Sequence, residues 1–429
     1  MLKLDTSNVL NKLNKHNSKR YERAIKNIIS NIELTSAKGC EMMGWYSLPN
    51  NYDSTLLLAM KKKAAEWKKY RLAYVVVIGI GGSYVGVRAA IDMCCGAVDK
   101  EGPEIIWVHN MGATYINNLF KKIGKKQFAI IVISKSGTTI EPAIGFRLFR
   151  ELLEKRVGKD KAHKYIVAIT DAEAGTLHEM ALKNNYTTFG IPNTIGGRFS
   201  VLTPVGLFPM LIKGIDILQV LAGARQAIKD CSPIELDKNS AYNYACLRHY
   251  LYTNKSLVIE NMIVYDPSMV FVSEMWRQIF GESEGKNHCG LYPDVSLFTT
   301  DLHSMGQYLQ EGVRNFFETT IWVNQPLHDQ TLNIRDNVDK LKYLNKKTLH
   351  KLSYSAFMGT IHAHTKIGKV NNIIIQIDKQ DAFHFGYLFL WFAISLTISA
   401  YLLGVNPFNQ PGVEAYKHNM FKLLGKKKS

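Results

Sequence analysis

The stretch with the clearest chemical potential is a run of hydroxyl side chains, Ser134-Lys135-Ser136-Gly137-Thr138-Thr139. It follows an apolar run of strand length, Phe128 to Ile133, and precedes Ile140-Glu141-Pro142, which has the pattern of a helix start. Unpaired backbone N–H groups and the positive end of a helix dipole meet at such a turn, and the hydroxyls add donors. One capping hydroxyl suffices for a helix, so a plain N-cap cluster is the alternative. The sequence predicts a pocket for a phosphate monoester.

A glycine-rich turn, Gly79-Ile80-Gly81-Gly82-Ser83, follows another apolar run at residues 73–78. It is not the dinucleotide fingerprint, because Tyr84 stands where that pattern needs its third glycine. His109 and Asn110, instead of an acidic residue, follow the next apolar run. Glycines let a backbone approach a ligand closely and Ser83 adds a donor, although a structural tight turn is the alternative. If both turns follow strands of one parallel sheet, they open on the same crevice.

Other candidates for chemistry are isolated charged side chains. The segment Gly281-Glu282-Ser283-Glu284-Gly285-Lys286 places two carboxylates in a glycine-flanked turn, which offers a general base or, alternatively, only a solvated acidic turn. Arg198 follows a glycine pair, and its permanently charged, forked guanidinium suits an oxyanion or a phosphate. His303 and Lys417 are weak signals when each is taken alone.

Composition predicts a globular protein of several domains. The chain has 429 residues, 46% hydrophobic and 21% charged, which is too long for one ordinary core. Its formal charge of +17 is dispersed and not interleaved with aromatic residues, so we expect a basic surface that draws anionic substrates and no nucleic-acid partner. The six cysteines show no CxxC spacing, and the basic N-terminus is unlike a secretory leader, which predicts a reducing cytoplasm.

His362 and His364 lack a third ligand nearby, so we expect a helix surface there and no metal.

One apolar segment could indicate a membrane protein instead of a globular one. Tyr387 to Val405 is long enough to span a membrane. It is the only such segment, polar residues interrupt it, and no basic anchor flanks it. We therefore expect a buried core helix, with a membrane protein as the alternative.

The order of apolar patterns predicts how these residues are positioned. The first 70 residues have helical patterns, clearest at 21–32 and 54–70. Short β-branched runs at 73–78, 105–108, 128–133 and 165–170 are separated by amphipathic segments, which is typical of βαβ units around a parallel sheet. A second, less regular α/β series has strand candidates at 260–265, 316–323 and 372–377.

Together these blocks resemble the glucose-6-phosphate isomerase family of the bacterial type. Ile195 to Gly206 (IGGRFSVLTPVG) is similar to one family signature and Asn406 to Lys417 (NPFNQPGVEAYK) to the other, and the resemblance runs from about Gly79 to Lys417. It implies an α/β fold of two tandem sugar-isomerase (SIS-type) doubly wound parallel-sheet domains with flanking helices. We expect a helical segment at 1–70, SIS-type domains at 71–210 and 211–400, and a catalytic-lysine loop with a C-terminal helix at 401–429.

The resemblance also implies roles for single residues. Glu282 matches the family's base, Arg198 the arginine beside the developing negative charge, and His303 the ring-opening histidine, which the neighbouring subunit of a homodimer contributes. Lys417 matches a catalytic lysine. The resemblance implies that the substrate is bound by the residues Gly82, Ser83, Ser134, Lys135, Ser136, Gly137, Thr138, Thr139, Gln278 and Gln410.

One position departs from the family pattern. Asn409 stands where aspartate is usual, although the position tolerates asparagine. Apart from this, the resemblance implies no cofactor, no metal and no membrane partner.

The reaction that the resemblance implies is the reversible aldose–ketose isomerisation of glucose 6-phosphate to fructose 6-phosphate, in glycolysis and gluconeogenesis. It needs ring opening and then a proton transfer between C2 and C1 through a cis-enediolate, which one carboxylate can perform. Two alternatives remain open. One is an isomerase of the same fold that acts on amino-sugar or mannose phosphates, and the other is a sugar-phosphate sensor without catalysis.

Overall fold

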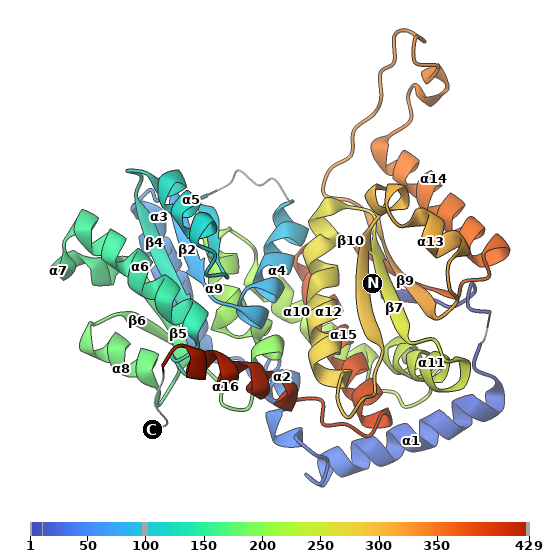
Figure 1. Cartoon of the computed structure of the whole chain (residues 1–429), viewed down its shortest axis with the longest axis horizontal. Coiled ribbons are helices and arrows are strands. Elements are labelled where there is room, and N and C mark those ends of the chain that lie inside the picture. Colours follow the sequence, from blue (N-terminus) through green and yellow to red (C-terminus); the bar gives the residue numbers. More distant parts are fainter. Residues whose placement is uncertain (1, 11, 97–101, 426–429) are drawn as a thin grey trace.

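The computed structural model describes residues 2–10, 12–96 and 102–425 and contains two five-stranded sheets, each covered by helices (Figure 1). The first sheet has the strand order β3-β2-β4-β5-β6, and all its strands are parallel. The second has the order β1-β10-β9-β7-β8 and is parallel except for β1. The predicted α/β fold of two doubly wound parallel sheets is therefore confirmed.

The first sheet forms where the sequence shows unbroken apolar runs. Its central strands are buried on both faces because helices cover both sides, which explains their lack of polar alternation. Its edge strand β6 was not predicted, because its sequence TTFGI is short and half polar. The strands are β2 (Tyr74–Ile78), β3 (Glu104–Val108), β4 (Phe128–Ile133), β5 (Ile166–Asp171) and β6 (Thr187–Ile191).

The second sheet contains two strands that the sequence did not indicate. β1 pairs antiparallel with β10, so the expectation that the first 70 residues are all helical is wrong at its start. The edge strand β8 carries a proline and an aspartate, which hid its pattern. The strands are β1 (Leu2–Asp5), β7 (Ile259–Val264), β8 (Tyr292–Leu297), β9 (Phe316–Gln325) and β10 (Asn372–Lys379).

A long apolar helix, α15 (Ala382–Leu402), forms the core of the second unit. Within the described residues it is the one helix long and apolar enough to cross a membrane, and 89% of its most apolar window is buried, as predicted for a core helix. It packs against α10 (Ile217–Asp230) so closely that a Cβ on Gly223 would lie 1.8 Å from the Phe383 carbonyl oxygen. α11 (Ser240–Lys255) and α12 (Val270–Glu284) complete this layer.

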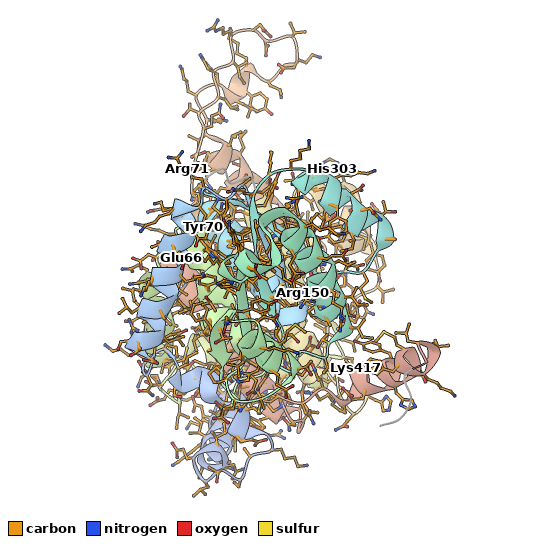
Figure 2. All side chains as sticks on the ribbon, turned by 90° about the vertical axis from the view of Figure 1, so that its left-hand side faces the viewer. Glu66, Tyr70, Arg71, Arg150, His303 and Lys417 are labelled. Carbon is orange, nitrogen blue, oxygen red and sulfur yellow. The ribbon has the colours of Figure 1, made fainter. Side chains whose placement is uncertain are left out.

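The remaining helices cover the sheets and connect the two units. The C-terminal helix α16 extends from the second unit toward the first, and Figure 2 shows it, with Lys417, at the side of the body, whereas α1 runs along the second unit (Figure 1). The chain between β9 and α14 projects from the body (Figure 1). These helices are α1 (Lys15–Glu33), α2 (Gly44–Ser47), α3 (Ser54–Lys69), α4 (Val85–Cys95), α5 (Ala113–Ile123), α6 (Ile140–Val157), α7 (Lys159–Ala162), α8 (Thr176–Lys183), α9 (Pro204–Ile212), α13 (Gly306–Glu311), α14 (Leu349–His362) and α16 (Glu414–Leu423).

The residue limits of the four predicted parts stay a proposal. The two sheets fall within the predicted second and third parts, with β1 as the exception, and residues 426–429 of the last part lie outside the described residues.

Candidate active site

The candidate base lies at the end of a helix and not in a turn. Glu282 and Glu284 belong to the last turn of α12, so the predicted glycine-flanked turn is wrong in its local structure. The Glu282 side chain is 33% exposed. Its Oε1 accepts a hydrogen bond from Nε2 of Gln278 at 2.8 Å, one helical turn earlier, and its Oε2 accepts from Nη1 of Arg198 at 3.2 Å. Both carboxylate oxygens are therefore held in place.

Arg198 joins three segments that are far apart in the sequence. It is buried in a 3₁₀ turn, Gly197–Leu202, where its Nε donates to Ser283 Oγ at 2.8 Å. Its Nη2 donates to the carbonyl oxygens of Pro407, at 2.6 Å, and Asn409, at 3.2 Å. Burial lowers the pKa of Arg198, while the Glu282 carboxylate opposes that shift. One cation thus fixes the base helix to the loop that leads to Lys417.

The glycine turn after β2 lies against this arginine segment. A Cβ on Gly82 would lie 2.1 Å from the Gly197 carbonyl oxygen, and Gly81, with φ +61°, would place one 2.9 Å from Gln278 Nε2. The glycines therefore permit a close approach between two protein segments. Ser83 follows in the same turn and is half-buried. Gly82, Gln278, Glu282 and Arg198 form one cluster, with Ser83 in the same turn as Gly82, and the binding of the sugar by these residues stays a prediction.

The hydroxyl turn after β4 is held by its own side chains. Ser134 Oγ accepts from Gly137 N at 3.1 Å, and Ser136 Oγ lies 3.0 Å from Thr138 Oγ1. Gly137 has φ +75°, and a Cβ there would lie 2.3 Å from Leu177 N, so no other residue fits. Thr139 is the N-cap residue of α6, yet its side chain makes no capping hydrogen bond. The plain N-cap explanation therefore does not account for this hydroxyl, and the start of α6 keeps the donors that an anion needs.

The lysine within this turn has a protein partner. Lys135 Nζ donates to the carbonyl oxygen of Asn193 at 3.0 Å, and burial lowers the pKa of Lys135 while Asp171 opposes that shift. Its ammonium group is therefore held by a backbone carbonyl beside the hydroxyl turn.

Lys417 and His303 occupy different places. Lys417, on α16, donates to Glu414 Oε1 at 2.8 Å. That hydrogen bond raises the pKa of Lys417, and the charge of Glu141, in the first turn of α6, adds a smaller contribution. His303 is exposed in a short turn after β8, and Figure 2 shows it well separated from Lys417. The structure does not bring His303 and Lys417 together within one chain.

The loop before α16 contacts the site through its backbone. Arg198 holds the carbonyl oxygen of Asn409 and not its side chain, so this contact is the same with asparagine or aspartate. Gln410 follows it directly and is exposed.

Sequence reasoning missed two residues of this cluster. Ser283 is fully buried and accepts from Arg198. Lys286 Nζ donates to the carbonyl oxygens of Ser283 and Asn406, and burial lowers the pKa of Lys286 to about 8, helped by Arg198. Both belong to the block that was singled out for its carboxylates, so their position beside Glu282 was the available signal.

The histidine pair behaves differently from its prediction. His362 is exposed as expected, but His364 is buried and its Nδ1 lies 2.7 Å from Glu318 Oε1, so the helix-surface interpretation is wrong for His364.

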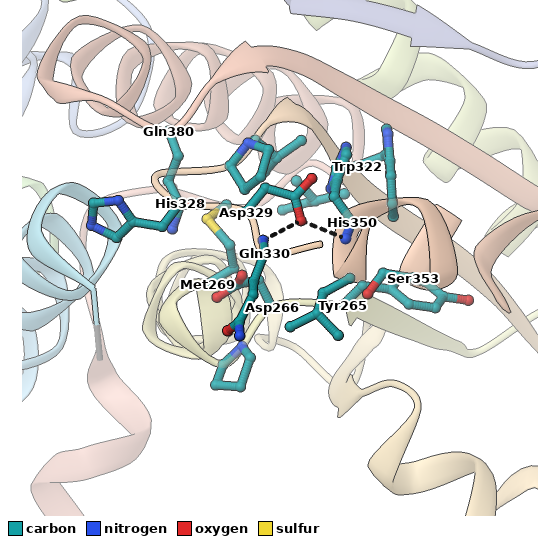
Figure 3. A pocket seen from close by; sticks show the side chains of 15 residues that line it. Tyr265, Asp266, Met269, Trp322, His328, Asp329, Gln330, His350, Ser353 and Gln380 are labelled. Atoms are coloured by element: carbon teal, nitrogen blue, oxygen red, sulfur yellow. Dashed lines mark hydrogen bonds between the residues drawn. The ribbon is translucent and has the colours of Figure 1, made fainter. Parts of the chain in front are cut away.

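A separate pocket of about 440 Å³ lies at the carboxyl ends of β7, β9 and β10 (Figure 3). Asp329 Oδ1 accepts from the backbone N–H groups of Gln330, at 2.9 Å, and His350, at 3.0 Å. None of the 15 lining residues is lysine or arginine.

Comparison with known proteins identifies the family. Residues 52–311 match the phosphoglucose isomerase family model. The chain is 45% identical to glucose-6-phosphate isomerase of Mycoplasma mobile over 98% of both chains. It is 48% identical to that of Mycoplasma capricolum over 94% of both.

Solved structures agree in fold. A hypothetical protein of Thermus thermophilus superposes with a TM-score of 0.89 at 25% identity, over 99% of this chain and 100% of that one. A glucose-6-phosphate isomerase of Chlamydia trachomatis has a TM-score of 0.80 at 18% identity, over 99% of this chain and 88% of that one. The chain therefore belongs to the phosphoglucose isomerase family.

Proposed function

We propose that this protein is an isomerase that interconverts glucose 6-phosphate and fructose 6-phosphate. The observation that carries the proposal is the Glu282 carboxylate, which lies between the Gln278 amide and the Arg198 guanidinium beside the glycine turn after β2. Relatives that share almost the whole chain are named for this activity.

Glu282 is proposed to move the proton between C2 and C1 of the open-chain sugar. A positioned carboxylate can remove and return the proton on the same face, which suits a cis-enediolate. Arg198 donates hydrogen bonds to four protein acceptors, Ser283, Glu282, Pro407 and Asn409, so it acts on the enediolate through its nearby charge.

The hydroxyl turn Ser134–Thr139 is proposed to bind the phosphate, and Gln410 to line the pocket. The phosphate takes no part in the reaction, but its binding holds C1 and C2 against Glu282. Lys417, on α16, is proposed to assist ring opening, and the charge of Glu141 on α6 is close enough to contribute to its raised pKa.

The deciding experiment is a coupled assay. Purified protein is mixed with fructose 6-phosphate, glucose-6-phosphate dehydrogenase and NADP⁺, and NADPH should form in proportion to the protein. Binding of fructose 6-phosphate without NADPH formation would contradict the proposal and favour a sensor.

We further propose a cytoplasmic homodimer in which His303 of each subunit opens the ring in the neighbouring active site. The exposed position of His303, apart from Lys417, supports this arrangement (Figure 2). The variants His303→Ala and Glu282→Gln should each be inactive. A mixture allowed to exchange subunits should regain about one quarter of the wild-type activity, because half of the dimers are mixed and each mixed dimer has one intact site. No recovery despite proven exchange would place His303 in its own subunit's site.

A further inference from the structure

A second arginine anchors the helix end that carries Glu282. Arg248, on α11, is fully buried. Its Nη1 donates to Glu284 Oε1 at 2.6 Å and its Nη2 to Glu284 Oε2 at 3.1 Å. Glu284 is the last residue of α12 and only 1% exposed. A bidentate pair fixes the orientation of the carboxylate as well as its distance, so the last turn of α12 cannot rotate without breaking it.

Arg248 is itself held from two more directions. Its Nε donates to Glu260 Oε2 and its Nη1 donates to Ser399 Oγ at 2.9 Å. Glu260, on β7, also accepts at 2.6 Å from Tyr244 OH and from Thr319 Oγ1. Each oxygen of both carboxylates therefore has a donor. A buried polar network that is fully satisfied in this way is rigid.

Stability alone does not explain this network. A buried ion pair rarely stabilises a fold more than apolar side chains of the same volume would, because desolvation offsets the attraction. The carboxylate of Glu284 also lies at the C-terminus of a helix, where the dipole opposes negative charge. An apolar residue at position 284 would fill the same space.

The same helical turn is held on its other side by Arg198. Glu282 and Ser283 bind Arg198, from the segment after the first sheet, whereas Glu284 binds Arg248, from the second unit. Consecutive residues of one turn are thus fixed by two arginines from different parts of the chain.

We propose that Arg248 and Glu284 are positioning residues for the proton transfer. They fix the last turn of α12 so that the Glu282 carboxylate stays aligned with the two carbons between which the proton moves. The proposal rests on the proposed function, because it takes Glu282 as the base. A displacement of about 1 Å at a reacting group can cost about 100-fold in rate.

The test replaces the network as a whole. Removing one partner alone would leave a buried unpaired charge and destabilise the fold. The informative variant combines Arg248→Met, Glu260→Gln and Glu284→Leu, which keep the volume and remove the pair. We expect kcat to fall about 10- to 100-fold while KM for fructose 6-phosphate stays within about twofold.

A matched control is available on the opposite face of the same sheet. Glu318 is buried there and binds His364 and Asn372, at 2.7 and 2.9 Å. It follows Phe317, which pairs with Glu260, so its side chain points away from α12. The variant Glu318→Gln with His364→Gln should lose thermal stability but keep kcat.

Two results would overturn the proposal. One is an unchanged kcat in the network variant, and the other is an equal fall of kcat in the control at equal stability. Hydrogen exchange of the backbone amides at 281–286 gives a measure independent of turnover, and it should be faster in the network variant than in the wild type and the control. Unchanged exchange would refute the positioning role, whereas a wild type that lacks isomerase activity would refute the proposed function instead.

Discussion

The two sheets share one topology but differ in what lies at their carboxyl ends. The order β3-β2-β4-β5-β6 of the first corresponds to β8-β7-β9-β10-β1 in the second, and only the last strand differs in direction. Each sheet therefore offers a crevice where its strand order reverses, between β2 and β4 or between β7 and β9.

The residues that follow the strands make these crevices chemically opposite. The first has glycine and hydroxyl turns at a helix start, which suit an anion. The second has Asp266 after β7 and Asp329 after β9, without a lysine or arginine among its lining residues (Figure 3). Topology places a crevice, whereas the side chains at the strand ends decide what it binds. In a chain of net charge +17, the acidic crevice is the one that does not suit a sugar phosphate.

The largest expected effect is the loss of the base. Glu282→Gln keeps the size of the side chain but cannot take a proton, so kcat should fall by about 10³-fold or more. Binding of the sugar phosphate, measured by calorimetry, should remain. The matched change in the second crevice, Asp329→Asn, should leave kcat unchanged. An equal loss of kcat in Glu282→Gln and Asp329→Asn would contradict the proposed difference between the two crevices.

A smaller effect is expected at the phosphate end. Ser136→Ala with Thr139→Ala removes two hydroxyls and should raise KM for fructose 6-phosphate by about 30-fold or more, since each hydrogen bond to the charged phosphate contributes at least about 1 kcal/mol and about 1.4 kcal/mol corresponds to a factor of ten. kcat should change little, because the phosphate does not react. Ser353→Ala, in the second crevice, serves as the control. An unchanged KM in the double variant would mean that the phosphate binds elsewhere.

The smallest expected effect is a pH dependence of the free energy of unfolding that arises from Lys286, close to Glu282 in the chain. The pKa of Lys286 is lowered to about 8 by burial, so between pH 8 and the ordinary lysine value the unfolded chain binds more protons than the folded one. The contribution of Lys286 to the free energy of unfolding therefore rises with pH between about pH 8 and the ordinary lysine pKa. Relative to Lys286→Gln, the wild type should gain about 1 kcal/mol from pH 8 to pH 10, a figure reduced for partial exposure.

Denaturant titrations at both pH values would measure this difference. The control is Lys379→Gln, at the exposed end of β10. If the difference in free energy of unfolding between the wild type and Lys286→Gln is the same at both pH values, solvent reaches the Lys286 ammonium group.

The sequence predicted the parts of this molecule that depend on local pattern. β2 and β4 are unbroken apolar runs and β5 is apolar up to Ile169, as expected for strands that helices cover on both faces. β1 pairs with a strand near the other end of the chain, and β6 is short and half polar, so no local signal marks these edge strands.

The candidate site likewise contains residues that the local sequence indicates and residues that only the fold brings together. Residue types and family motifs indicated Glu282 and Arg198 as parts of one site, but their contacts depend on the fold. Arg248 could not be predicted, because an arginine that holds two carboxylates is recognised only when its partners are adjacent. Lys286 was indicated only by its place in the block around Glu282, and its carbonyl partners depend on the fold. His364 was expected on a helix surface, but Glu318 on β9 pairs with it in the interior, which only the fold could show.

The pairing of β1 with β10 has a consequence for synthesis. Leu2 is opposite Ile377, so 375 residues (377 − 2) separate the partners. At translation rates of about 5–20 residues per second, the earlier strand waits roughly 20–75 s for the later one to leave the ribosome. Lys417 is made later still, although it lies near α6 of the first unit. A nascent chain that stops short of α16 therefore carries a finished first sheet but lacks Lys417, a residue of the proposed catalytic centre.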